Sequence, residues 1–212
     1  SNQPPNLNDP MKPLFSTIAL TLALGISNLS AQNWAIQVSG GESGMKILCD
    51  GELVTKFNYR NTPKPYFYPL IGPTGEPVTR GYPMEEFEDE QTDHQHHRSL
   101  WFAHADVNGI HFWGEKRGND KRKFGTIRHA KLSSMRMGGN PCSFTAHSDW
   151  IGPEGEKVCE DVTTYQFSKT PEGFFTIDFD VTIKASEGEV TLGDNKDGVM
   201  AIRLLPTMVL RK

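Results

Sequence analysis

The sequence predicts an all-β fold, namely an antiparallel β-sandwich. From residue 34 onward, short runs of residues alternate between apolar and polar side chains, which is the pattern of strands that bury one face. Turn-forming residues separate these runs, and the 212-residue chain contains 20 glycines and 14 prolines. No apolar repeat with helical spacing extends beyond two turns in this region. Many short strands joined by turns that contain glycine and proline are typical of a sandwich or a barrel.

Four strands are expected in the first half of the domain, at residues 34–39, 45–50, 53–59 and 66–71. Asp50-Gly51 separates the second strand from the third and favours a two-residue hairpin turn, because both residue types tolerate positive φ. The fourth strand is rich in aromatic residues and ends at Gly72-Pro73-Thr74-Gly75, a sequence that favours a turn.

The remaining strands are expected at residues 100–105, 107–113, 124–137, 143–151, 158–167, 173–183 and 199–210. Gly152-Pro153-Glu154-Gly155 predicts a turn between two of them. Residues 204–210 have the composition of a core strand, which would pair on both sides, and two residues follow them. We therefore expect the domain to be incomplete at its C-terminus.

The N-terminal region has the pattern of an export signal. Met11-Lys12 supplies a positive charge, residues 14–26 are apolar, and small residues follow up to Ala31. The apolar stretch is shorter than the roughly 20 residues that span a bilayer. We expect residues 11–31 to be a signal peptide, residues 1–10 to be an upstream remnant, and residues 32–212 to form one secreted or periplasmic domain. After cleavage no stable membrane insertion is expected, and an uncleaved anchor is the alternative.

The charge balance argues against a nucleic-acid partner. The formal net charge is −4, and the basic residues are scattered apart from a short group at residues 116–123. A nucleic-acid-binding domain carries a basic face. We interpret the group at residues 116–123 as a solvated loop.

Three cysteines leave two alternatives open. Cys142 and Cys159 flank a segment that contains a turn, so they could form a disulfide across a hairpin and leave Cys49 free. Equally, all three thiols could be small buried apolar groups.

The segment Asp93-His94-Gln95-His96-His97-Arg98 is the strongest indication of a functional site. It combines three imidazoles, a carboxylate and a guanidinium, and His104 and His111 follow it closely. Buried polar groups that lack partners are costly, so a segment with only a packing role would not concentrate them in this way.

Acid–base chemistry on a sugar is one interpretation of this segment, because histidine donates and accepts protons near neutral pH. We predict His96 and His97 as catalytic residues, with Glu160 as a carboxylate partner. Residues that could bind hydroxyl groups, a carboxylate or a sugar ring are Arg80, His94, Arg98, Trp101, Asp106 and Asn108. Two structural alternatives remain: Trp101 packs in the core, and residues 106–109 form a simple turn.

A bound metal is the second interpretation. If residues 93–97 are extended, His94 and His96 share a face, and a third ligand could come from His104, Asp106 or Glu160. We expect no cofactor, with a divalent metal at His94 and His96 as the alternative.

The chain also resembles a known family at these residues. The matching blocks are residues 64–70, residues 78–80, the segment Asp93-His94-Gln95-His96-His97-Arg98-Ser99-Leu100-Trp101-Phe102, residues 106–113, and Asp197-Gly198. They are similar to the secreted bacterial PmoA-like family, also called DUF6807. Gln95 stands where that family usually has proline, and Ser99 where it usually has glycine.

The resemblance implies a secreted, sugar-related β-sandwich similar to the galactose-mutarotase supersandwich. The family label "methane oxygenase PmoA" would imply a metal-dependent oxygenase, although that name belongs to a subunit with several transmembrane helices. We expect a carbohydrate or another small molecule as the ligand. The expected function is a sugar epimerase, lyase or hydrolase, with a non-catalytic carbohydrate-binding module as the alternative.

Overall fold

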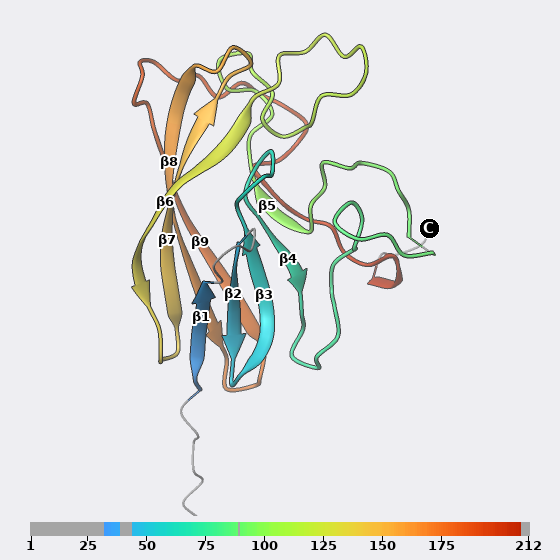
Figure 1. Cartoon of the computed structure of the whole chain (residues 1–212), viewed down its shortest axis with the longest axis vertical. Helices are drawn as coiled ribbons and strands as arrows, with labels where there is room; N and C mark the ends of the chain where they lie inside the picture. The colour runs from blue at the N-terminus through green and yellow to red at the C-terminus, as the bar shows by residue number, and fades with distance from the viewer. Residues whose placement is uncertain (1–31, 39–43, 89, 209–212) are drawn as a thin grey trace, which may run out of the picture. The chain divides into compact units, whose positions relative to one another are not determined.

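Two antiparallel sheets account for the strands of the structure, a computed structural model that describes residues 32–38, 44–88 and 90–208 (Figure 1). In the first sheet the strands lie in the order β1-β2-β3-β4-β5-β10. Their bounds are Trp34–Val38, Gly44–Cys49, Glu52–Asn58, Tyr66–Leu70, Leu100–Phe102 and Met200–Ile202. The second sheet has the order β6-β7-β8-β9, with bounds Thr126–Arg136, Cys142–Ile151, Lys157–Lys169 and Phe175–Lys184. The all-β prediction is confirmed.

Short turns fix the hairpins where the sequence predicts them. Asp50 and Gly51 have φ values of 53° and 88°, so both central residues of the β2–β3 turn adopt the left-handed region. This is the geometry that matches the twist of the flanking strands. Gly155, with φ 88°, similarly closes the turn between β7 and β8.

The main core lies between the two sheets. In β7 every second side chain from Cys142 to Trp150 is buried, which is the alternation of a strand with one face against a core. The ring of Phe57 on β3 lies 5.2 Å from the rings of both Phe144 and Tyr165 in the second sheet. Truncating such a buried ring to alanine costs about 3–5 kcal/mol. These contacts establish the sandwich.

A second apolar cluster supports the loops that carry the candidate site. Trp101 of β5 and Phe112 of the following connection are buried in this cluster together with Trp150 of β7. Phe112 and Trp150 have ring centroids 4.8 Å apart. The long connections at residues 71–99 and 103–125 lie outside the regular strands (Figure 1), and this cluster anchors the second of them.

Three expected strands are shorter or absent. The strand expected at residues 100–105 is limited to β5, Leu100–Phe102. In place of a strand at residues 107–113, Asn108 and Gly109 have φ values of 52° and 77° and form a tight turn closed by a bridge between Val107 and Ile110. The last expected strand, residues 199–210, is limited to β10 and followed by a 3-10 turn at Pro206–Met208. Pro206 has no N–H to donate to a ladder, which explains why pairing stops there. Residues 209 and 210 lie outside the described residues.

The hairpin disulfide is not formed. All three cysteines are free and buried. In the β7–β8 register Cys142 is opposite Phe167 and Cys159 is opposite Trp150, so the two thiols face different partners. Burial raises the pKa of Cys142 and of Cys159 to about 11. The alternative of three small buried thiols is confirmed.

The described residues include no helix of the length and apolarity needed to cross a membrane. The expected signal peptide at residues 11–31 and the upstream remnant at residues 1–10 lie outside the described residues.

Candidate functional site

The three clustered histidines lie on a turn that precedes β5. The N–H of His97 donates to the carbonyl oxygen of His94 at 2.9 Å, and His94 has φ 46°. The segment is therefore not extended, and the expectation that His94 and His96 share one face of a strand is wrong. The turn instead gathers all three rings. The ring centroids of His94 and His97 are 4.7 Å apart, and those of His96 and His97 are 4.4 Å apart.

The rings of Trp101 and Trp113 pack beneath this turn. The ring of His97 stacks on that of Trp101 at 5.2 Å and 27°. Trp101 in turn lies 5.0 Å from Trp113. Trp101 is only 1% exposed, so it supports the imidazoles and offers no open face to a sugar. The structural alternative for Trp101 is the one that the fold adopts.

Asp93 connects the turn to two arginines. Its Oδ1 accepts hydrogen bonds from Arg80 at 2.5 Å and from Arg203 at 3.0 Å, and its Oδ2 lies 2.6 Å from Nδ1 of His94. Partial burial alone would raise the pKa of Asp93, but the hydrogen bonds from Arg80 and His94 and the charge of Arg203 hold it well below its ordinary value. Asp93 is therefore an ionised acceptor at neutral pH.

The ionised carboxylate of Asp93 fixes the tautomer of His94. An ionised carboxylate only accepts hydrogen bonds, so Nδ1 of His94 carries the proton in the contact with Asp93. In the neutral ring, Nε2 is then the free acceptor. A carboxylate that orients an imidazole in this way is a recurring arrangement for a general base.

His96 and His97 are neutral at pH 7. Desolvation by burial lowers the pKa of His96 to about 4, and the charge of Lys64 adds to the effect. Burial likewise lowers the pKa of His97 to about 3, with a contribution from His96. Neutral imidazoles can each donate one hydrogen bond and accept another.

Glu115, another residue at the site, binds two cationic side chains. Arg98 donates to its two carboxylate oxygens at 2.9 and 3.1 Å, and the Nζ atom of Lys64 lies 3.8 Å from it. Lys64 is 1% exposed and donates to the carbonyl oxygen of Trp113 at 2.7 Å. Its burial lowers the pKa of Lys64 to about 7, against the opposing charge of Glu115. Arg98 is thus committed to an internal ion pair and stacks over the ring of Tyr66.

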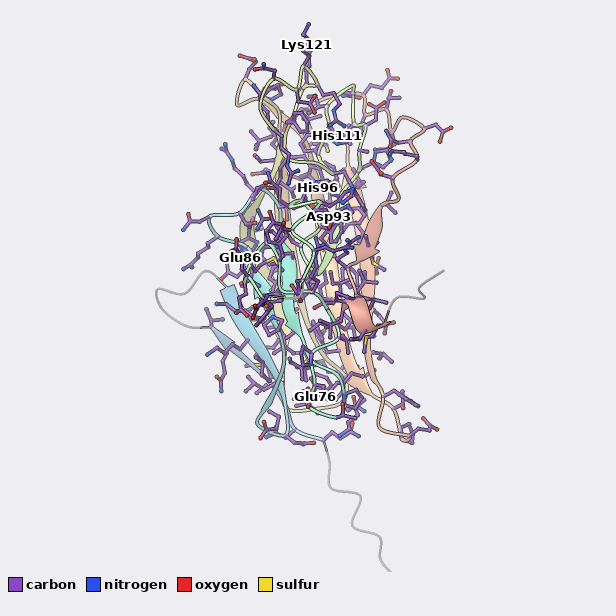
Figure 2. The ribbon with its side chains drawn as sticks, turned by 90° about the vertical axis from the view of Figure 1, so that its right-hand side faces the viewer. Glu76, Glu86, Asp93, His96, His111 and Lys121 are labelled. Carbon is purple, nitrogen blue, oxygen red and sulfur yellow. The ribbon has the colours of Figure 1, made fainter. Side chains whose placement is uncertain are left out.

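These groups border a pocket of about 450 Å³. In Figure 2, His111, His96 and Asp93 lie one below another near the middle of the view, beneath the loop that carries Lys121. The pocket is lined by Asp93, His94, His96, His97, His111, Trp113, Gly114, Glu115, Arg117, Asp120, Arg122, Lys196 and Asp197. A larger hollow of about 540 Å³ shares Gly114, Glu115 and Arg122 with it but contains no imidazole.

The structure brings some of the predicted site residues together and separates others. His94, His96 and His97 line the pocket. Arg80, at 1% exposure, lies behind it and reaches it through Asp93. Arg98 and Trp101 also serve as supports.

Glu160 does not join the histidines. Its carboxylate accepts from Lys157 at 2.9 Å and pairs with Lys184 at 3.5 Å. The next residue, Asp161, is buried and accepts a hydrogen bond from the indole N–H of Trp150 at 2.8 Å. Side chains alternate along a strand, so an inward Asp161 places Glu160 on the outer face of β8. The carboxylates at the pocket are Asp93, Glu115, Asp120 and Asp197.

Asp106 and Asn108 also lie outside the pocket. Asp106 accepts from the N–H of Gly109 at 2.9 Å, which closes the turn. The side chain of Asn108 donates to the carbonyl oxygen of Glu189 at 3.1 Å and accepts from the N–H of Thr191 at 2.7 Å. Both hold the loops together, as the turn interpretation expects. Asp106 borders an adjoining hollow that shares His111 and Arg122 with the pocket.

Sequence reasoning missed several residues of the site. The basic residues of the loop at residues 116–123 are exposed, as the sequence predicts, but Arg117 and Arg122 also line the pocket. Arg122 pairs with Asp120 at 2.6 Å and approaches Nε2 of His111 at 3.3 Å. The available signal was the proximity of two basic clusters to the histidine segment. For Lys64, the available signal was its position two residues before the aromatic strand β4.

The described residues contain no group of three or more histidine, cysteine, aspartate or glutamate side chains placed to hold a metal ion. His104, one of the expected third ligands, uses its Nδ1 to accept from the backbone N–H of Asp106 at 3.1 Å. Among the described residues, His94 and His96 therefore belong to no group of three such side chains.

Comparison with known proteins identifies a family but no characterised relative. No curated protein and no solved structure matches the chain. The sequence profile of a family described as "Family of unknown function (DUF6807)" matches residues 44–211. That match covers every strand except β1 and every residue that lines the pocket. The chain therefore belongs to the DUF6807 family.

Proposed function

We propose that this protein acts on a carbohydrate outside the cytoplasm and binds it in the pocket bordered by His94, His96 and His97. The reaction class is acid–base chemistry on a sugar, as in an epimerase, a lyase or a hydrolase. His94 is the proton acceptor, because Asp93 holds the proton of the neutral ring on Nδ1 and so presents Nε2 to the ligand. His96 and His97 bind hydroxyl groups.

The contact between Asp93 and His94 is the observation that carries this proposal. It combines a short hydrogen bond of 2.6 Å with a carboxylate held ionised by Arg80 and Arg203. The histidine itself is 53% exposed, so a ligand can reach it. A volume of about 450 Å³ lies within the range of small-molecule sites.

A non-catalytic carbohydrate-binding module is the second candidate. The lowered pKa values of His96 and His97, about 4 and 3, favour it. Such rings stay neutral at pH 7 and are suited to hydrogen bonding with hydroxyl groups rather than to donating a proton. In this case the pocket would hold a sugar without changing it.

Turnover and binding by matched variants separate the two candidates. The full chain is incubated with a panel of oligosaccharides, and products are followed by NMR while binding is followed by calorimetry. For an enzyme, His94→Asn lowers turnover at least about 100-fold and leaves binding within about tenfold. A binding module shows saturable binding, no product, and only modest weakening in His96→Ala and His97→Ala. Absence of both binding and turnover across the panel contradicts the proposal.

Export is supported by the sequence pattern at residues 11–31. If it operates, N-terminal sequencing of the protein from a cell envelope or culture fraction should begin near Gln32. Recovery of the intact N-terminus from the cytoplasmic fraction alone would contradict export.

A further inference from the structure

We infer that the ligand of this pocket is an acidic carbohydrate, a sugar that bears a carboxylate or a sulfate ester. The inference rests on the proposed function and names its substrate class. It follows from how the charged side chains at the pocket are paired with one another.

Most carboxylates at the pocket already have cationic partners within the protein. Asp93 is bonded by both Arg80 and Arg203. Asp120 accepts from Arg122 at 2.6 Å. These contacts leave little negative charge to oppose an anionic ligand.

Glu115 is neutralised in the same way. It accepts two hydrogen bonds from Arg98 and has Lys64 at 3.8 Å. Asp197 is the remaining carboxylate of the lining. The pKa of Arg122 is raised mainly by the hydrogen bond that Arg122 donates to Asp120, and the negative charge of Asp197 raises it further.

Two cations of the lining stand in contrast. Within the described parts of the chain, no side chain forms an ion pair with Arg117 or Lys196, although both border the pocket. Both are exposed, so their charged groups can reach a ligand. Arg117 offers a planar guanidinium that can bind a carboxylate or a sulfate through two hydrogen bonds.

The pocket and its direct partners therefore carry an excess of positive charge. The lining itself holds three cations, Arg117, Arg122 and Lys196, and four carboxylates, Asp93, Glu115, Asp120 and Asp197. Arg80, Arg98 and Arg203 pair with these carboxylates and bring the cations to six. Lys64, whose pKa is about 7, adds part of a further positive charge. The chain as a whole has a formal net charge of −4. Because the protein as a whole is acidic, a cluster of cations at one place is not a result of overall composition. We attribute it to the binding of a negatively charged ligand.

The neighbourhood does not reverse this balance. The adjoining hollow adds Asp106 and Asp194 together with Lys123. The larger hollow adds Glu154 and Glu156 together with Lys116. The loop at residues 116–123 also presents Lys116 and Lys121, which are exposed. Unpaired cations at a cleft attract a ligand of opposite charge.

The lowered pKa values of the histidines are consistent with positive charge around the pocket. After burial, the charges that lower the pKa of His96 include Lys64 and Arg117. Those that lower the pKa of His97 are, in order, His96, His94, Arg203 and Arg80. A positive potential disfavours a protonated imidazole and favours an anion at the same place.

Matched sugars test the inference. Binding of the full chain to oligogalacturonate is compared with binding to its methyl-esterified form, which keeps the rings and removes the charge. A second pair, κ-carrageenan oligosaccharides and their desulfated form, tests a sulfate ester in the absence of a carboxylate. We expect at least about tenfold tighter binding to the charged member of one pair, equivalent to one charge-assisted contact. The preferred pair identifies the acidic group.

The double variant Arg117→Gln/Lys196→Gln locates the effect. Both residues are exposed, so folding should be retained. We expect this variant to lose the preference for the charged sugar, while Arg128→Gln/Lys131→Gln, which removes the same charge from exposed positions of β6, keeps it. Raised salt should weaken the charged complex more than the neutral one.

The possible results separate the two claims. Equal binding to charged and neutral sugars, dependent on His94, overturns the acidic ligand and leaves the proposed function standing. A charge preference that survives in the Arg117→Gln/Lys196→Gln variant also overturns it. Absence of binding to either member of both pairs and to the wider panel contradicts the proposed function and, with it, the inference.

Discussion

The Nδ1 atom of His94 lies 2.6 Å from Oδ2 of Asp93, whose other carboxylate oxygen is held by Arg80 and Arg203. This relationship joins a buried arginine to an exposed imidazole through one carboxylate. It makes Asp93 both a structural support and the group that sets the tautomer of His94. The two roles can be separated by experiment.

Replacing Asp93 by asparagine should lower both stability and activity. Arg80 is 1% exposed and would lose its carboxylate partner, which should reduce the free energy of unfolding by about 1–3 kcal/mol. An amide can also donate a hydrogen bond to Nδ1, so His94 would no longer be held in one tautomer. Turnover should fall by roughly 100- to 10,000-fold. Urea denaturation and product formation measure the two effects.

Arg203→Gln is the matched control for Asp93→Asn. Arg203 is 29% exposed, and its contact with Asp93 should contribute no more than about 1 kcal/mol. The contact between Asp93 and His94 is retained in this variant, so turnover should stay close to wild type. Equal losses of activity in the two variants would show that Asp93 acts only through the stability of the fold.

Stability should decline on acidification between pH 6.5 and 4. The folded-state pKa values of His96 and His97 are about 4 and 3, below the ordinary value of 6.5. In that interval the unfolded chain binds protons that the folded chain does not, so lower pH favours unfolding. His96→Gln/His97→Gln should flatten the dependence of unfolding free energy on pH, measured by urea denaturation. His129→Gln should flatten it less, because only one shifted group, with a pKa of about 4, is removed.

Lys64 should produce a second pH dependence, on the alkaline side. Its folded-state pKa is about 7 and its ordinary value 10.5. Between these values the unfolded chain again holds the extra proton, so stability rises as pH increases from 7 to 10.5. Lys64→Met should remove this rise. An unchanged slope in Lys64→Met between pH 7 and 9.5 would show that the amine is charged when folded.

Asn108 should matter for stability rather than for binding. It has φ 52° and bonds to the backbone of Glu189 and Thr191. Asn108→Ala should cost about 2 kcal/mol, from lost hydrogen bonds and a strained backbone. Asn108→Gly should cost less, because glycine tolerates this φ. A larger loss in the glycine variant would mean that backbone strain plays no part.

Local signals predicted the sandwich well. The Asp50-Gly51 turn, the alternation along β7 and the aromatic run of β4 are properties of a few neighbouring residues, and the structure follows them. The prediction of a long strand at residues 199–210 was wrong, because apolar composition cannot show whether a partner strand is available. Pro206 was the local sign against it.

The site was predicted only in part, because it depends on contacts distant in sequence. The cluster of imidazoles was visible, but its turn requires the hydrogen bond between His97 and His94. Glu160 was predicted as the catalytic carboxylate from its residue type alone. Only the structure shows that its side chain points away from the histidines. The pairs of Arg203 with Asp93 and Arg98 with Glu115 span 110 and 17 residues, and no local pattern announces them.

The most direct test of the account is the titration of the imidazole NMR signals of the full chain with oligosaccharides, led by oligogalacturonate. His129 and His147 serve as internal controls, since they lie outside the pocket. We predict saturable shifts for His94, His96 and His97, with the two controls unchanged. Saturable binding that leaves these three signals in place would contradict the account.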